Sequence, residues 1–406
     1  MPPTDYYTRS TIGVALGGAY WGKGEILNAA QAFRECASSA LKGGYQQRAS
    51  SALCYQGMMQ VRQAKLLQAE ETFQKAFELS LGPGGRRFPV SGYSLAKLGE
   101  LACEWDELDK AHPLVTDAIT LCTQLGHVDL IAEAYAALAR VQLAMRDFTG
   151  AQNTLQQADQ LSQGVTLDPW AMCWLDKCRL RLWIATDKLD RAIRWTETSG
   201  LKLDDEFSFH HDLHHINLAR VLIAQITQTS SPSTFDKVSE LLARLLKTAK
   251  SAGWVHKEIK ILVLQALALY AMKDGKEALT ALTQALTLSE PGGYIRTFIN
   301  EGAPMGSLLH QALIQGIKPT YAYKLMMAFE EDTRIHQEKS ALADPLTDRE
   351  IEVLRLLATP LSATEIAAKL VVSVHTVRSH TKSIYSKMGV HSRIQAVDQA
   401  KETGVL

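Results

Sequence analysis

The sequence predicts an all-α protein in which a long helical-repeat solenoid is followed by a small four-helix domain. Roughly the first 340 residues are rich in Ala, Leu and Gln, and they are longer than one compact core usually becomes. A spaced motif recurs along them at a nearly constant interval, which is typical of stacked helix pairs. Residues 346–406 combine helix-start signals with concentrated basic charge, although the chain balances 43 basic with 43 acidic residues.

The recurring motif is a small residue, an apolar residue four positions later and a second small residue three positions after that. Clear copies are Ala29-Phe33-Cys36, Ala69-Phe73-Ala76, Ala111-Val115-Ala118, Ala151-Leu155-Ala158 and Ala278-Leu282-Ala285, and weaker copies begin at Ala192 and Val238. Their first residues lie 40, 42, 40, 41, 46 and 40 positions apart. Small residues allow neighbouring helices to approach closely, so we expect each copy to lie in the second helix of an antiparallel pair.

This pattern resembles tetratricopeptide repeats with a lengthened period, which implies a tetratricopeptide-like solenoid with a concave binding surface. We expect loops at 81–89, where the sequence reads LGPGGRRFP, and at the Ser/Thr/Pro-rich insert 227–234. The insert would account for the 46-residue interval.

The C-terminal segment contains start signals for four short helices. Ser/Thr-x-x-Glu/Gln capping boxes begin at Thr347, Ser362 and Ser392, and the hydroxyl of Ser373 can cap the third helix. Only Val371-Val372 separates the second helix from the third, which predicts a tight helix-turn-helix corner. Glycines suited to left-handed helix ends are Gly389 and Gly404. The remaining small core is expected at Leu354, Leu357, Ile366, Ala367, Leu370 and Ile394.

The third of these helices, Ser373 to Met388, has one apolar and one basic face. Its buried stripe is expected at residues spaced three and four apart, namely Val374, Val377, Thr381, Ile384 and Met388. Another side carries His375, Arg378, Ser379 and Lys382, inside a window, 366–397, without any acidic residue. A short helix of this kind suits a DNA groove, although an ordinary solvated face has the same pattern.

The run LTDREIEVLRLLATPLSATEIAAKLVVSVHTVRSHTKSIYSKMGVHSRIQAV closely resembles the LuxR-type helix-turn-helix over its full length. In that family the third helix enters the major groove. The resemblance implies that Arg378, Ser379 and Lys382 face base edges, where Arg can pair bidentately with guanine. It implies phosphate contacts for Lys387 and Arg393, and the DNA-binding set also includes His375 and Thr376. Thr364 replaces the usual Lys, which would remove a backbone contact, and Pro360 replaces the usual Gly, which would stiffen the corner before the second helix.

A second segment, SEPGGYIRTFINEGAPMGSLLHQAL at 289–313, resembles the junction of the large ATP-binding LuxR-family regulators typified by the maltose-regulon activator. Those proteins contain an ATPase module, a helical-repeat sensor and a DNA-binding domain, and this chain matches the last two. We therefore predict a solenoid over 1–328 that ends in the junction segment 289–328, a polar tether over 329–345 and a LuxR-type domain over 346–406.

Two further patterns bear on cofactors. Gly17 to Gly24 satisfies the phosphate-loop spacing G-x-x-x-x-G-K but lacks the preceding strand and the following hydroxyl, and it fits the first helix and turn of a repeat. The run 210–215 contains His pairs at i, i+4 that can hold zinc or nickel, yet it equally fits the outer face of a repeat helix. The six cysteines lack metal-ligand spacing, so we expect reduced thiols, no metal and no cofactor. With neither a signal peptide nor a long apolar run, the sequence predicts a cytoplasmic protein without a membrane segment.

Tryptophans concentrate at Trp170, Trp174, Trp183 and Trp195. Trp170 and Trp174 share a helix face and, with Arg179 nearby, are candidates for binding a ligand; the alternative is that they belong to the repeat core. No catalytic motif is evident, so the chain is not expected to be an enzyme.

The leading hypothesis is a transcription regulator that binds double-stranded DNA as a homodimer and a small-molecule inducer or protein partner through its solenoid. The resemblance places the dimer contact in the fourth helix, Ser392 to Thr403, and a two-fold operator follows from it. Two alternatives stay open. One is an interaction scaffold in which DNA binding is secondary, and the other is a fragment of a larger ATPase-type regulator.

Overall fold

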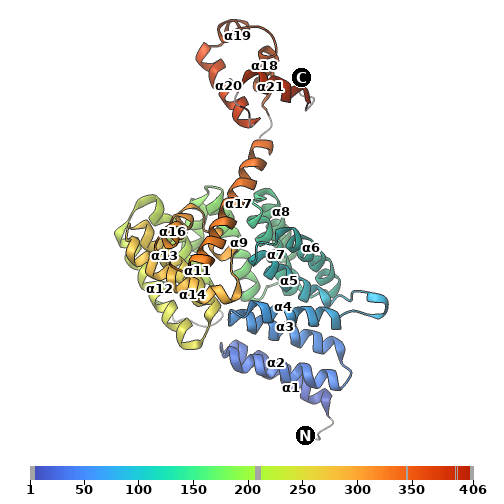
Figure 1. The fold of residues 1–406 in the computed structure, drawn as a ribbon. Helices are drawn as coiled ribbons and strands as arrows, with labels where there is room; N and C mark the ends of the chain where they lie inside the picture. Colours follow the sequence, from blue (N-terminus) through green and yellow to red (C-terminus); the bar gives the residue numbers. More distant parts are fainter. Residues whose placement is uncertain (1–4, 206–211, 344–345, 389, 391, 403–406) are drawn as a thin grey trace. The chain divides into compact units, whose positions relative to one another are not determined.

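The computed structural model describes residues 5–205, 212–343, 346–388, 390 and 392–402. Within these ranges the chain is helical and contains no β-strand, which confirms the predicted all-α class (Figure 1). It divides into two compact units, Met1–Ala328 and Phe329–Leu406, which are described one at a time.

The first unit is a series of helix pairs followed by shorter helices. The pairs are α1 (Tyr6–Gly22) with α2 (Ile26–Lys42), α3 (Gln46–Arg62) with α4 (Leu66–Leu79), α5 (Ser91–Glu104) with α6 (Leu108–Leu125), α7 (Val128–Ala144) with α8 (Phe148–Leu161), α9 (Pro169–Ala185) with α10 (Leu189–Thr198), α11 (Asp212–Thr229) with α12 (Pro232–Ala252), and α13 (Val255–Ala271) with α14 (Gly275–Ser289). They are followed by α15 (Arg296–Ile299), α16 (Ala303–Ile314) and the start of α17 (Pro319–Ala343), and short 3₁₀ turns occur at Pro83–Gly85 and Glu290–Gly292.

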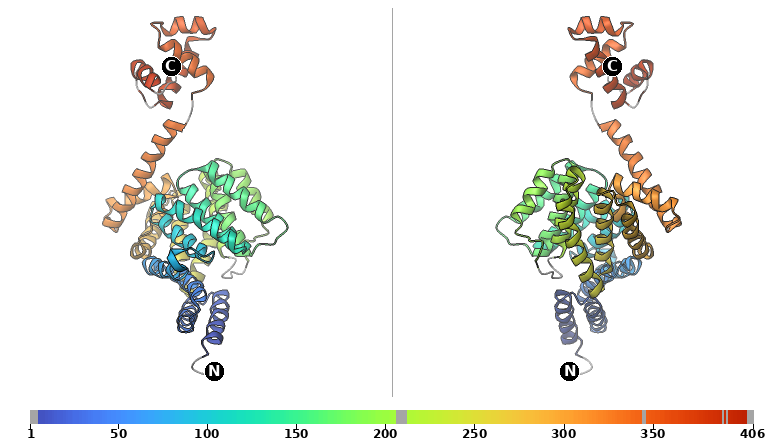
Figure 2. Two further views of the ribbon diagram at one scale, coloured as in Figure 1. Left: turned by 90° about the vertical axis from the view of Figure 1, so that its right-hand side faces the viewer. Right: turned by 90° about the vertical axis from the view of Figure 1, so that its left-hand side faces the viewer.

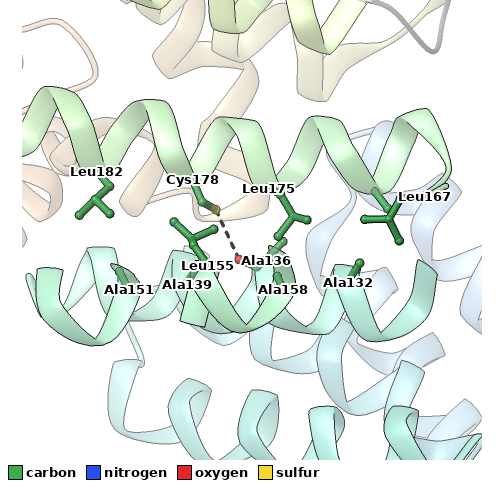
Figure 3. Packing of buried hydrophobic residues seen from close by; sticks show 11 residues of the cluster. Ala132, Ala136, Ala139, Ala151, Leu155, Ala158, Leu167, Leu175, Cys178 and Leu182 are labelled. Carbon is green, nitrogen blue, oxygen red and sulfur yellow. Dashed lines mark hydrogen bonds between the residues drawn. The ribbon is translucent and has the colours of Figure 1, made fainter. Parts of the chain in front are cut away.

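Every copy of the sequence motif lies in the second helix of a pair, as predicted. The first residues of the seven copies are fully buried, at 0% exposure: Ala29, Ala69, Ala111, Ala151, Ala192, Val238 and Ala278. Figure 3 shows this packing, in which Leu175 and Leu182 of α9 point toward the small side chains of α7 and α8. The thiol of Cys178 donates to the backbone carbonyl oxygen of Ala136 at 3.5 Å and so connects α9 to α7.

Three glycines bring the helices of the early pairs closer still. A Cβ atom at Gly17 would lie 2.4 Å from the ring of Phe33, and one at Gly57 would lie 2.5 Å from the ring of Phe73. Each phenylalanine is the apolar residue of the motif in the paired helix. At Gly99 it would lie 2.5 Å from Val115 Cγ1. These glycines therefore complete the motif from the first helix of each pair, and the spaced pattern in the second helix did not reveal them.

The turn inside each pair contains one residue with a left-handed backbone. These residues are Gly24, Ala64, Asp106, Arg146, Asp187, Ser230 and Lys273, with φ between 50° and 76°. Glycine, which adopts this conformation without steric cost, occupies only the first turn. The other turns are therefore held by packing of the helices on either side, and they carry no glycine signal in the sequence.

Two of the three segments expected to be irregular, 227–234 and the tether 329–345, are mostly helical in their described residues. The loop at 81–89 is present and contains a short 3₁₀ turn, but most of 227–234 is helical, since α11 ends at Thr229 and α12 begins at Pro232. The long interval instead contains the segment between the end of α10 at Thr198 and Asp212, where the description of α11 begins. The expected tether is also helical as far as Ala343, because Glu, Gln, Lys and Ala favour a helix even where their polarity suggests a linker.

The pairs wind so that the beginning and end of the solenoid meet (Figures 1 and 2). Trp254, just before α13, donates its indole N–H to the carbonyl oxygen of Gly24 at 2.8 Å. The junction segment then returns to the middle pairs: Trp105 Nε1 donates to the oxygen of Gly292 at 2.9 Å, and the amide of Thr297 donates to Glu104 Oε1 at 2.8 Å. Contacts across almost the whole sequence thus enclose the interior of the solenoid.

The second unit contains the C-terminal part of α17 and four short helices: α18 (Asp348–Leu357), α19 (Ala363–Leu370), α20 (Val374–Lys387) and α21 (Arg393–Glu402). Both sides of the capping boxes at Thr347–Glu350 and Ser362–Glu365 are formed. The hydroxyl oxygen of Ser373 accepts the amide of Thr376 at 3.0 Å, and that of Ser392 accepts the amide of Gln395 at 3.3 Å. The predicted helix starts are therefore confirmed. Gly389, Gly404 and the side chain of Ile394 lie outside the described parts.

The core of these four helices contains most of the predicted apolar residues. Fully or nearly buried are Val353, Leu354, Leu357, Ile366, Ala367, Val377, Ile384, Val390, Ala396 and Ala400. Val374, Leu370 and Met388 pack against them while half-buried. The apolar stripe of α20 thus faces inward, as its spacing predicted.

The close approach at Gly99 predicts the effect of adding one methyl group. Gly99→Ala should lower the free energy of unfolding of the solenoid by about 1–2 kcal/mol, because Val115 is stiff and the oxygen of Ala111 would lie 3.3 Å from the new atom. Denaturant unfolding followed by tryptophan fluorescence measures the change.

Gly18→Ala is the matched control. Nothing lies within 4 Å of its Cβ position, so this helical glycine should gain up to about 1 kcal/mol of stability. Equal effects of the two substitutions would contradict the packing argument.

Candidate functional site

The basic face of α20 is accessible. His375, Arg378, Ser379 and Lys382 are exposed, whereas Thr376 is half-buried and its hydroxyl lies 2.7 Å from that of Ser373. No ion pair or side-chain hydrogen bond among the described residues engages Arg378 or Lys382. Their charges are therefore available to an anionic partner.

The corner before α20 is tight and strained. Val371 ends α19 in a left-handed conformation, with φ of 55°, and its side chain is 91% exposed. A β-branched residue rarely adopts this backbone, because its Cβ approaches the following carbonyl oxygen. The predicted helix-turn-helix corner is present, with one strained residue setting the direction in which α20 leaves it.

Glu350 connects the first helix of this unit to α20. One oxygen closes the capping box with Thr347, at 2.8 Å from its amide, and also accepts Lys387 Nζ at 2.9 Å. The other accepts the hydroxyl of Ser383 at 2.6 Å. Burial raises the pKa of this carboxyl, but these hydrogen bonds outweigh burial and lower the pKa of Glu350 to about 2. The sequence revealed the capping role of Glu350, whereas its contact with α20 required the folded arrangement.

The two residues expected at phosphate have partners inside the domain. Lys387 is paired with Glu350 and is mostly buried, with 15% of its side chain exposed. Arg393 donates from Nε to the carbonyl oxygen of Leu357 at 2.8 Å and from a terminal nitrogen to that of Thr359. Both side chains thus serve the domain's own packing, whereas Arg378 and Lys382 on α20 are exposed. Thr364 and Pro360 are exposed on α19 and before it.

The solenoid contains an interior pocket with an empty volume of about 510 Å³, part of it continuous with solvent. Its lining comes from α3, α4, α5, α7, α9 and α13 and includes Arg62, Lys97, Glu100, Glu104, Arg140, Trp174 and His256. A neighbouring hollow of about 310 Å³ shares Lys97, Glu100, Arg140 and Trp174 and adds Glu133 and Lys177. The pocket thus combines helices that are far apart in the sequence.

The three candidate ligand residues have different surroundings. Trp170 is buried and contacts Trp21, Trp174 and the guanidinium of Arg62, so it is part of the interior packing. Trp174 is half-buried and lines both hollows. Arg179 is ion-paired with Asp159 and Asp176 and lines neither hollow. Of the three, Trp174 alone presents its side chain to the pocket.

The other cofactor patterns fall on ordinary repeat structure. Gly17 to Gly22 are inside α1, and the turn to α2 follows directly, so these residues do not form a phosphate-binding loop. His210 and His211 lie outside the described residues, and His215 is buried with Nε2 3.2 Å from the oxygen of Lys202. In the described part of the chain no three metal-binding side chains are grouped to hold an ion. All six cysteines are buried free thiols.

The repeats and the capped domain together define a helical-repeat protein that carries a C-terminal helix-turn-helix of the DNA-binding kind. Two family models match the chain: the MalT-like TPR region over residues 1–315, and the luxR family of bacterial regulatory proteins over residues 344–400. The chain belongs to the MalT-like TPR family and ends in a luxR-family domain.

Curated proteins similar to this chain are HTH-type transcriptional regulators MalT. The protein of Serratia proteamaculans (strain 568) is 24% identical over 426 residues, covering 99% of this chain and 46% of that protein. The proteins of Yersinia pestis (strain Pestoides F) and Yersinia pseudotuberculosis (strain YPIII) are each 26% identical over 434 residues, with the same coverage. The chain thus spans about half the length of the curated relatives it matches. Among the described helices, none has the length and apolar character needed to cross a membrane.

Glu350→Gln should destabilise the C-terminal unit at neutral pH. Glu350 has a pKa of about 2 in the folded chain and about 4.3 when unfolded, so its contribution is present above pH 4.3 and is lost as the pH falls toward 2. The contribution is about 3 kcal/mol. All seven tryptophans lie between Trp21 and Trp254, so circular dichroism without a fluorescence change detects unfolding of this unit.

Glu352→Gln is the control for Glu350→Gln, because Glu352 is exposed and pairs with Arg349 on the same helix. We expect the Glu350→Gln unit to be less stable at pH 7 and to lose less stability on acidification than the control. If both variants respond alike to pH, Glu350 does not hold α18 and α20 together.

Val371→Gly should stabilise the same unit by about 1 kcal/mol, because glycine removes the left-handed strain and the exposed valine loses no packing. Val372→Gly should do the opposite, since Val372 packs against the core. Thermal unfolding followed by circular dichroism distinguishes the two, and destabilisation by both would disprove strain at Val371.

Proposed function

We propose that the chain is a DNA-binding transcription regulator that reads DNA with α20 and senses an inducer or protein partner with its solenoid. The accessible basic face of α20 is the observation that carries this proposal. Arg378, Ser379 and Lys382 project from one side of a helix whose other side is fixed in the core. A helix held in this way can enter the major groove and present side chains to base edges.

Arg378 and Lys382 have the chemistry to pair with guanine O6 and N7, and Ser379 can donate to or accept from a base edge. His375 and Thr376, at the start of the helix, are assigned to the adjacent DNA backbone. Lys387 and Arg393 lie at the opposite end of the reading helix and beyond it. Their partners in the domain suggest that they position α20 and contribute to phosphate binding only secondarily.

We further propose that two chains bind a two-fold site through α21. Ala396 and Ala400 of α21 face the core, while Gln395 and Asp398 are exposed on its outer side. Two reading helices related by such an axis would meet successive major grooves about 34 Å apart. The resulting operator would be an inverted repeat.

The solenoid has the features of a sensor because its pocket is connected to α17, which leads toward the DNA-binding domain along the chain. His256, a lining residue, lies with Nδ1 2.7 Å from the hydroxyl of Tyr294. The hydroxyl of Tyr321, at the start of α17, donates to the carbonyl oxygen of Tyr294 at 2.5 Å. A ligand that displaced His256 would act on this chain of contacts, which is a physical route for coupling.

Arg378→Ala with Lys382→Ala should abolish sequence-specific binding. Duplexes enriched from a random library by the wild-type chain provide the operator, and fluorescence anisotropy gives its Kd. Loss of the arginine alone should weaken binding by about tenfold to a hundredfold, in keeping with about 1–3 kcal/mol for one bidentate base contact.

Arg355→Ala with Lys369→Ala removes the same charge from exposed positions on α18 and α19. This control should lose affinity equally for operator and random DNA, whereas the α20 variant should lose the difference between them. An unchanged preference for the operator in the α20 variant would exclude α20 as the reading helix.

A further inference from the structure

We propose that the interior pocket of the solenoid binds a small organic anion. Arg62, Lys177 and Lys260 would hold its carboxylate or phosphate group beside the indole of Trp174. The inference rests on the proposed sensing function and specifies the chemistry of the molecule that is sensed.

The pocket contains more cations than anions. Its carboxylates already have partners: Glu100 and Glu133 accept Lys97 Nζ at 2.8 and 2.9 Å. Glu104 accepts Arg140 at 2.6 Å. These pairs use all three carboxylates of the two hollows. Arg62 and Lys177, which line the hollows, therefore have no carboxylate partner among the described residues, and neither has Lys260, which contacts the lining residue His256.

Arg62 is the strongest evidence for an anion site. It is 7% exposed and yet has no hydrogen-bond or ion-pair partner in the described parts of the chain. Its guanidinium lies 4.8 Å from the centre of the Trp170 ring, and its buried Nε–H is unsatisfied. Burial of a guanidinium without a hydrogen-bond or ion-pair partner is unfavourable, so such a group is usually paired. Arg62 lines the pocket, where a bound anion would satisfy it.

Lys177 and Lys260 approach the same tryptophan from two helices. Lys177 Nζ lies 4.8 Å and Lys260 Nζ 5.8 Å from the centre of the Trp174 ring. Lys260 also donates to the neutral ring of His256 at 2.6 Å, and no carboxylate accepts either ammonium group among the described residues. Since Trp170 and Trp174 are 6.0 Å apart, all three cations surround one aromatic pair.

The protonation behaviour agrees with an excess of positive charge. Burial, reinforced by Arg140, Arg181 and Arg220, lowers the pKa of Lys177 to about 7. Burial and Lys177 lower the pKa of Lys260 well below its usual value, and burial with Lys260 does the same for His256. An added anion would oppose each of these shifts.

Cation–π contacts compensate the three charges only in part. Even a desolvated contact of this kind contributes less than it costs to bury a guanidinium or an ammonium. Empty space lies beside these groups, because Arg62 and Trp174 both line the pocket and part of the pocket is continuous with solvent. The combination of space, an indole and unpaired cations therefore favours an anion with a small carbon skeleton over a neutral ligand.

Calorimetry on the full chain with three hexose derivatives tests the proposal. Glucose, glucuronate and glucose 6-phosphate share the pyranose ring and differ in the group at C6, so they separate a neutral, a carboxylate and a phosphate ligand. We expect saturable binding of at least one of the two anions and none of glucose at the same concentrations. Binding of neither anion, or equal binding of glucose, would overturn the proposal.

Arg62→Met and Lys177→Met identify the site, because methionine retains the apolar stem and removes the charge. Each should weaken anion binding by about tenfold or more, as expected for loss of one charge-assisted contact. Each should also raise the melting temperature of the free chain, because an unpaired buried charge is removed. Lys247→Met, at an exposed position on α12, is the control and should change neither quantity.

A purely structural cluster would give the reverse pattern, with a lower melting temperature in Arg62→Met and Lys177→Met and unchanged anion binding. That outcome would refute the anion site.

The charged groups that face Lys177 come from several helices: Lys97, Glu100, Glu133 and Arg140 from α5 and α7, Arg181 from α9, Arg220 from α11 and Lys260 from α13.

Proton uptake gives a second, independent measurement. Since Lys177 has a pKa of about 7 in the free chain, an anion beside it should raise that pKa and cause protons to bind near pH 7.5. The heat of binding should then depend on the ionisation enthalpy of the buffer, and it should lose this dependence in Lys177→Met. Buffer-independent heats in the unmodified chain would contradict the role of Lys177.

The outcomes for anion and operator are separable. Anion binding is measured without DNA, and operator binding is measured without anion. Loss of the operator preference with normal anion binding would refute the DNA-reading assignment alone, whereas normal operator binding with no anion bound would refute the pocket assignment alone.

Discussion

The close approach of paired helices is the constraint on which the rest of the solenoid depends. A fully buried first residue in each motif copy keeps neighbouring helices in contact, and Gly17, Gly57 and Gly99 lie opposite the apolar residue in three pairs. Because the same spacing recurs from pair to pair, small rotations accumulate and the stack winds. This winding allows Trp254 to reach Gly24, some 230 residues away in the sequence. The interior pocket is a consequence of that closure.

Closure places charged side chains where water is scarce, and their pairing then determines what the interior can do. Glu301 accepts both Arg181 and Arg220, and together these arginines outweigh its burial and lower its pKa to about 2. Arg296 is similarly satisfied by Asp106 and the oxygen of Ala144. These ion pairs hold the junction segment against the middle of the solenoid. Arg62 differs from them because its charge is buried beside empty space.

In the C-terminal domain, a few contacts fix the exposed basic helix α20 to a small core. One side of α20 is exposed to solvent and the other packs on the core. Glu350 caps α18 and also binds Ser383 and Lys387 of α20, so it connects the two helices. Orientation of the exposed face therefore depends on a buried carboxylate in another helix. Strain at Val371 belongs to the same geometry, since the chain must turn sharply between α19 and α20.

The sequence by itself determined what depends on near neighbours and on spacing. Capping residues such as Thr347 and Ser362, the inward stripe of α20 and the motif in the second helix of each pair follow from local hydrogen bonds and helical periodicity. The tertiary structure alone decided which distant charges meet. Arg62, Lys177 and Lys260 lie on three helices separated by long stretches of chain, and no periodicity relates them. For the same reason Trp170 is buried while Trp174 lines the pocket, because the winding of the solenoid decides which helices meet there. Lys387 has a carboxylate partner where its charge alone suggested phosphate, because the fold of the C-terminal unit brings Glu350 of α18 beside α20.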